Sequence, residues 1–80
     1  MAFEHAWTLN VFRARMVAEH DYAAGKTRVT MVYDDGTKRH RTGRLATDPG
    51  AIGDIANRIP APTWYRTACA DRDPGDAAHA

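Results

Sequence analysis

The feature that most constrains the fold is the stretch Asp34-Asp35-Gly36-Thr37, which separates two extended segments. Before it, apolar side chains recur at every second position from Val29 to Tyr33, which is the period of a half-buried strand. An Asp-Gly pair supplies the positive φ angles that a two-residue primed hairpin turn needs. The sequence therefore predicts an antiparallel hairpin whose return strand runs from Lys38 to Leu45.

A helix is expected directly after this hairpin. Asp48 can accept hydrogen bonds from the first-turn N–H groups, and Pro49 suits the first helical position. An apolar stripe at i, i+3, i+4 and i+7 follows, and Pro60 and Pro62 end the helix, so we predict a helix from Pro49 to Ile59. If it packs on the hairpin, Ile55→Ala should cost about 2 to 5 kcal/mol.

Two flanking segments complete the expected architecture. The stretch Trp7 to Glu19 fits either a helix face or a strand with a bulge between Val11 and Phe12. We favour a strand, because a two-stranded hairpin alone is only marginally stable. After the prolines, Thr63 can cap a short helix that ends at Asp71 or Arg72 and brings Trp64 to the core.

The predicted fold class is thus α+β, with a three-stranded antiparallel meander, one amphipathic helix on one face and a short C-terminal helix. We expect a single domain over residues 1–72 and a frayed tail over residues 73–80. The predicted core consists of Trp7, Leu9, Phe12, Met16, Val29, Met31, Tyr33, Leu45, Ile52, Ile55, Ala56, Ile59 and Trp64.

Composition limits the compartment and the class of protein. The chain has 80 residues, of which 44% are hydrophobic and 26% charged, which is the range of an ordinary globular domain. A single cysteine, Cys69, excludes an internal disulfide. No signal peptide and no apolar run long enough to span a bilayer is recognised. We therefore expect a cytoplasmic protein, and a monomer rather than an oligomer.

No catalytic or ligand-binding motif is present. The histidines, the cysteine and the carboxylates lack the spacing of a metal site or a triad, and the chain contains no serine. Gly25-Lys26-Thr27 lacks the earlier glycine of a phosphate-binding loop. We expect no catalytic residue, no metal and no cofactor. An enzyme would require Cys69 to lie within hydrogen-bonding reach of a histidine in a cleft.

The arginines suggest a binding surface instead. In the register that a two-residue turn sets, Val32 lies opposite Arg39 and Thr30 opposite Arg41, so both arginines share the outer face of the sheet. Such crowding of like charges is repulsive unless an acidic partner neutralises it. The predicted partner-binding residues are Arg13, Arg15, Arg28, Arg39, Arg41 and Arg44. Trp64 and Tyr65 are either core residues or, if exposed, an aromatic anchor.

The passage from Val29 through Asp34-Asp35-Gly36 and Arg41-Thr42-Gly43-Arg44-Leu45 to Asp48-Pro49-Gly50-Ala51 resembles short phage-encoded anti-CRISPR proteins. The resemblance implies a stoichiometric inhibitor without catalysis, which attaches to a surveillance complex and blocks either recruitment of target DNA or a conformational step. Taken with the arginines, it leads us to expect that the basic face docks on an acidic, nucleic-acid-binding surface of a host effector complex and blocks recruitment of target DNA. It implies no shared functional residues. The alternative is that the same face binds DNA or RNA directly, which would show as strongly salt-dependent retention on oligonucleotides.

Overall fold

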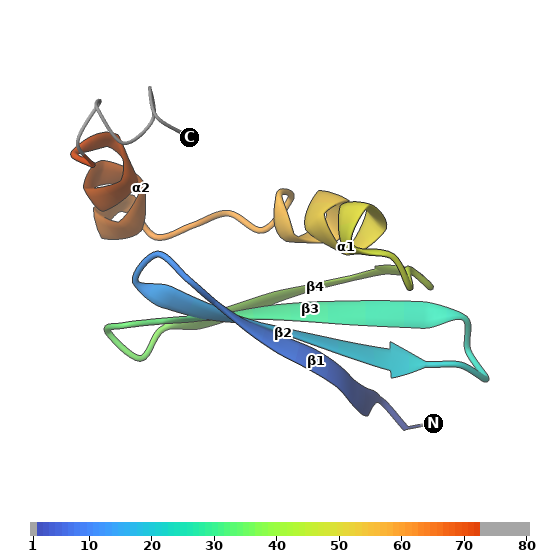
Figure 1. Ribbon diagram of the computed structural model, residues 1–80. Coiled ribbons are helices and arrows are strands. Elements are labelled where there is room, and N and C mark those ends of the chain that lie inside the picture. The colour runs from blue at the N-terminus through green and yellow to red at the C-terminus, as the bar shows by residue number, and fades with distance from the viewer. Residues whose placement is uncertain (1, 73–80) are drawn as a thin grey trace.

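A computed structural model describes residues 2–72 of the chain. Four strands form one antiparallel sheet in the order β1-β2-β3-β4, and two helices follow. Both helices lie on the same side of the sheet (Figure 1). The elements are β1 (Glu4–Val11), β2 (Ala14–Asp21), β3 (Lys26–Tyr33), β4 (Lys38–Arg44), α1 (Pro49–Ala56) and α2 (Thr63–Ala70). The α+β class is confirmed; the predicted tail, residues 73–80, lies outside the described residues.

The sheet has one strand more than predicted, because the segment expected to be a single bulged strand folds back on itself. Val11 pairs with Ala14 across a turn made by Phe12 and Arg13. Arg13 adopts a left-handed φ of 51°, a conformation that is uncommon outside glycine, asparagine and aspartate. The bulge predicted between Val11 and Phe12 is therefore a hairpin turn. The β-bulge in the structure lies earlier in the chain, between His5 and Trp7.

The turn between β3 and β4 is also different from the prediction, and it changes the register. The Gly36 N–H donates to the Tyr33 carbonyl and the Tyr33 N–H donates to the Thr37 carbonyl, which leaves a three-residue loop. Gly36 has a φ of 88°, as expected where a type I turn is followed by a left-handed residue. Met31 consequently lies opposite Arg39, and Val29 opposite Arg41. This shift by one residue moves every side chain of β4 to the other face.

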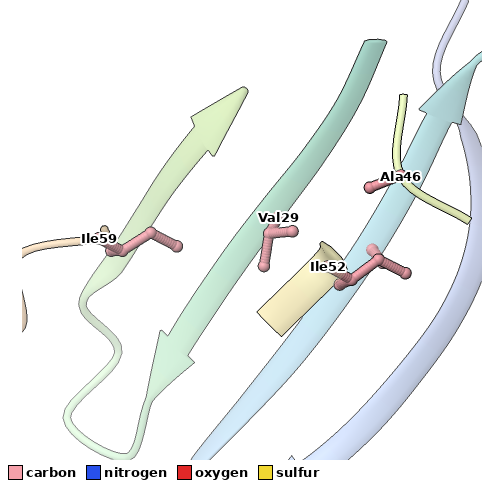
Figure 2. Close-up of a cluster of buried hydrophobic side chains, with 5 residues drawn as sticks. Val29, Ala46, Ile52 and Ile59 are labelled. Atoms are coloured by element: carbon pink, nitrogen blue, oxygen red, sulfur yellow. The ribbon is translucent and has the colours of Figure 1, made fainter. Parts of the chain in front are cut away.

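α1 packs over β3 and β4 and buries the centre of the molecule. Ile52, Val29 and Ala18 are fully buried, and Ala46 and Ile59 complete the cluster (Figure 2). The predicted start of the helix is confirmed, since Asp48 accepts a hydrogen bond from the Ala51 N–H at 3.0 Å and Pro49 is the first helical residue. The helix is shorter than expected and ends at Ala56, three residues before Ile59.

A close approach between α1 and β4 depends on a glycine. A Cβ atom on Gly43 would lie 3.2 Å from two side-chain carbons of Ile55, a distance tighter than nearly all real contacts. Gly43 also lies opposite Thr27, whose hydroxyl oxygen accepts a hydrogen bond from the Ala46 N–H at 2.8 Å. The buried His20 Nδ1 lies 2.8 Å from the same oxygen. These contacts join β2, β3 and the segment that leads into α1.

α2 is held at the end of the sheet where the β1–β2 and β3–β4 turns lie (Figure 1). The Trp64 indole N–H donates to Asp35 at 2.9 Å, and the Tyr65 hydroxyl donates to the Phe12 carbonyl at 2.7 Å. Tyr33 packs edge-on against Tyr65, with ring centroids 4.9 Å apart. The helix was predicted, but Thr63 is its first residue rather than its cap, and no side chain caps this end.

Candidate binding surface

The side of the sheet opposite the two helices is covered by no described helix or strand, and we call it the open face (Figure 1). Residues that lie directly opposite one another in neighbouring strands point to the same face of a sheet. A set of directly opposed residues across the four strands forms a row, and successive rows point to alternate faces. Because Gly43 lies close to Ile55 of α1, its row and every second row from it lie on the helix side. The open face therefore carries His5, Thr8, Asn10, Arg15, Val17, Glu19, Asp21, Lys26, Arg28, Thr30, Val32, Lys38, His40, Thr42 and Arg44.

Basic side chains outnumber acidic ones on the open face. Three of the six predicted residues are there: Arg15 on β2, Arg28 on β3 and Arg44 on β4. Lys26 and Lys38 join them, although neither was predicted as a site residue. In one row, Arg15 and Lys38 flank Val32 on either side. Strand spacing places the backbones of these two residues about 10 Å apart.

The other three predicted residues do not belong to this surface, so the expectation that Arg39 and Arg41 share the outer face of the sheet is wrong. Arg13 lies in the β1–β2 turn, where its guanidinium contacts Asp34 at 3.4 Å and lies over the Trp64 ring at 4.9 Å. Arg39 and Arg41 lie on the helix side, opposite Met31 and Val29. Arg39 donates a hydrogen bond to the Pro60 carbonyl, which fastens the connection between α1 and α2 to the edge of the sheet.

The basic residues of the open face differ in how they are neutralised. Arg28 donates to Glu19 at 3.1 Å, and its guanidinium lies 4.3 Å from the centre of the Phe3 ring. In the described part of the chain, Arg15, Lys26, Lys38 and Arg44 form no salt bridge. Lys26 lies directly opposite Asp21 of β2 on one side and Arg44 of β4 on the other, and the like charges of Lys26 and Arg44 repel. An acidic ligand on this face would remove that repulsion.

The lysines of the open face were missed for a simple reason. Under the predicted register, Lys38 belongs with the apolar side chains of Val29, Met31 and Tyr33. The Asp-Gly pair is compatible with both a two-residue and a three-residue loop, and only the second gives the observed faces. Lys26 precedes the alternating stretch that marked the strand, although β3 begins with it.

The aromatic residues after the prolines serve mainly to dock α2. Trp64 and Tyr65 are half-buried and contact each other, Tyr33 and the two turns. Burial raises the pKa of the Tyr33 and Tyr65 hydroxyls above their usual value. The carboxylate of Asp35 accepts hydrogen bonds from the backbone and side chain of Thr37 and from Trp64, and these hold its pKa below the usual value.

Other kinds of site receive no support from the described residues. Residues 2–72 contain no group of three or more histidine, cysteine, aspartate or glutamate side chains that is arranged to hold a metal ion. Cys69 is exposed on α2, and no histidine in that range is hydrogen-bonded to it. Neither α1 nor α2 is long and apolar enough to cross a membrane, and this holds for the whole described range.

Comparison of the chain with protein-family models, with curated proteins and with solved structures finds no match.

Proposed function

We propose that this chain is a small non-catalytic binding protein whose open face docks on an acidic surface of a larger protein. One observation carries the proposal: a sheet face with no helix over it presents Arg15, Lys26, Lys38 and Arg44 without carboxylate partners in the described part of the chain. Like charges that lie directly opposite each other in neighbouring strands destabilise a sheet, and opposite charges stabilise it. On this face the basic residues of β2, β3 and β4 outnumber the acidic ones, which are Glu19 and Asp21 of β2.

An acidic protein surface suits this face better than nucleic acid does. Sheets that bind single strands stack bases on exposed aromatic rings, whereas Phe3, near this face, already lies under Arg28. A duplex groove admits a helix or a two-stranded ribbon, while this sheet is four strands wide. Direct binding of DNA or RNA remains the alternative function.

The resemblance to phage-encoded anti-CRISPR proteins suggests a more specific form of this proposal. In that form the partner is a host effector complex, and the bound chain blocks recruitment of target DNA. A channel that binds nucleic acid is itself positive, so a basic face would be repelled by it. The acidic surface that we propose therefore lies beside such a channel, not on the nucleic-acid-binding surface that the sequence led us to expect, and the inhibition is steric.

The proposal is tested by comparing two variants that remove the same charge from opposite sides of the sheet. Arg15→Gln/Lys38→Gln removes two charges from the open face. Arg41→Gln/Arg58→Gln removes two exposed charges from the helix side. The ligands are fluorescent poly-glutamate and, separately, single-stranded and duplex oligonucleotides, with affinity measured by fluorescence anisotropy at several salt concentrations.

We expect poly-glutamate to bind the unmodified chain, and the open-face variant to lose about tenfold or more in affinity, or roughly 1.4 kcal/mol. The helix-side variant should stay within about threefold of the unmodified chain. Equal losses in both variants would contradict a role for the open face. Oligonucleotide binding that is tighter than poly-glutamate binding, with a steep salt dependence, would establish the alternative function.

A further inference from the structure

The two edges of the sheet have opposite character. β4 carries Lys38, Arg39, Arg41 and Arg44, and charged side chains of this kind protect an edge against pairing with another chain. The opposite edge, β1, contains no charged side chain from Trp7 to Val11. Its outer side has no neighbouring strand, because β1 is first in the order β1-β2-β3-β4. An unprotected edge of this kind is a template for a further strand.

The helix side of β1 is also incompletely covered. Leu9 is 48% exposed, and among the large hydrophobic side chains of residues 2–72 only Tyr22 is also exposed. α1 packs on β3 and β4, so it leaves an apolar groove of about 390 Å³ on the β1 side. Val11, Met16, Met31, Ile59 and Tyr65 are among its lining residues. A strand added beside β1 would cover Leu9.

In place of the monomer expected from the sequence, we propose that the occupant of this edge is a second copy of the same chain, paired antiparallel through β1 with Leu9 at the centre. The regular part of β1 runs from Trp7, directly after the bulge, to Val11, directly before the turn, and Leu9 is its midpoint. In this register Leu9 lies opposite Leu9 of the second copy. Trp7 lies opposite Val11, and Thr8 opposite Asn10.

The proposed register pairs apolar side chains with apolar ones on the helix side and polar side chains with polar ones on the open face. On the helix side it brings together apolar side chains from Trp7, Leu9 and Val11 of both copies. On the open face it brings a hydroxyl beside an amide, two groups that hydrogen-bond to each other. A second copy of β1 therefore supplies apolar contacts on the helix side and hydrogen-bonding partners on the open face. A partner of another kind is not needed to explain the residues of this edge.

The charges of the two copies do not oppose this arrangement. Directly opposed residues share a face, so both open faces lie on the same side of a continuous eight-stranded sheet. Strand spacing and rise place the two Arg15 residues about 16 Å apart, beyond the screening distance at physiological salt. The dimer is a proposal separate from binding of an acidic partner. It is measured without a ligand, so failure to dimerise can be distinguished from failure to bind poly-glutamate.

Two variants that differ at one residue test the interface and its register. Thr8→Lys/Asn10→Lys places a lysine opposite a lysine twice in the proposed dimer. Thr8→Lys/Asn10→Glu places a lysine opposite a glutamate twice. Both changed positions are exposed in the single chain. Position 10 lies directly opposite Arg15, which a lysine repels and a glutamate attracts, so the folding of each variant is checked separately by circular dichroism and urea unfolding. Sedimentation equilibrium over a concentration series gives the mass and the dissociation constant.

We expect the unmodified chain and Thr8→Lys/Asn10→Glu to dimerise, and Thr8→Lys/Asn10→Lys to dimerise at least about tenfold more weakly. A monomeric mass for the unmodified chain at every concentration would overturn the proposal. So would a dimer that the lysine pair leaves intact. Loss of the dimer in both variants would overturn the register centred on Leu9.

Discussion

At the scale of single residues, Asp35 connects the β3–β4 turn to α2. One of its oxygens accepts a hydrogen bond from the Thr37 N–H at 3.0 Å, and the other accepts from the Trp64 indole at 2.9 Å. These bonds are stronger to the ionised carboxylate than to the neutral acid, which is why the pKa of Asp35 is lowered in the folded chain. The same residue therefore fixes the loop geometry and the position of the second helix.

This linkage predicts a pH-dependent difference between the unmodified chain and Asp35→Asn. Because the pKa of Asp35 in the folded chain lies below its ordinary 3.8, the stabilisation is fully present above that value. It is lost as the pH falls through the lower pKa of the folded state. Urea unfolding should show the unmodified chain to be the more stable at about pH 7, with a gap that closes towards pH ~2. A gap that is independent of pH would contradict the role of the charge.

At the scale of elements, the docking of α1 depends most on its first buried isoleucine. Ile52 is fully buried against Val29, whereas Ile55 is half-buried beside Gly43. We expect Ile52→Ala to lower the free energy of unfolding by about 3 to 5 kcal/mol. For Ile55→Ala we expect roughly 1 to 2 kcal/mol, less than the sequence predicted, because Ile55 is only half-buried. Urea denaturation measures both. If the two substitutions lowered the free energy of unfolding equally, or Ile55→Ala lowered it more, α1 would be rotated relative to the structure described.

Local signals in the sequence were sufficient for the helix start and for the presence of a hairpin. Asp48 and Pro49 make their contacts within the first turn of the helix, and Asp35-Gly36 lie within a single hairpin loop. Residues close in sequence are therefore enough to decide that a helix starts and that the chain reverses at these positions. The turn at Phe12 and Arg13 has no such signal, because Arg13 takes a left-handed φ without being glycine or asparagine. A single strand from Trp7 to Glu19 would nevertheless be longer than strands usually are, and this length was the one indication in the sequence that the segment contains a turn.

The core could be predicted only in part for a related reason. Large apolar residues such as Val29, Tyr33 and Ile52 are buried as expected. Ala14 and Ala18 are buried because β2 is an inner strand, and strand order is a tertiary property that neighbours in sequence do not encode. Leu9 was expected in the core and is exposed because β1 is an edge strand.

At the scale of the whole molecule, one residue of register decides which charges form the candidate binding surface. With a three-residue loop after β3, Lys38 joins Arg15 on the open face, while Arg39 and Arg41 face the helix side. With a two-residue loop these assignments reverse. The composition of β4 alone does not discriminate, since basic residues occupy both faces of that strand.

The pairing of β3 with β4 is therefore the most direct test, and NMR measures it through cross-strand nuclear Overhauser effects between backbone protons. The account predicts effects that pair Met31 with Arg39 and Val29 with Arg41 as directly opposed residues. Effects that pair Val32 with Arg39 and Thr30 with Arg41 would contradict it. They would return both arginines to the open face and remove Lys38 from it.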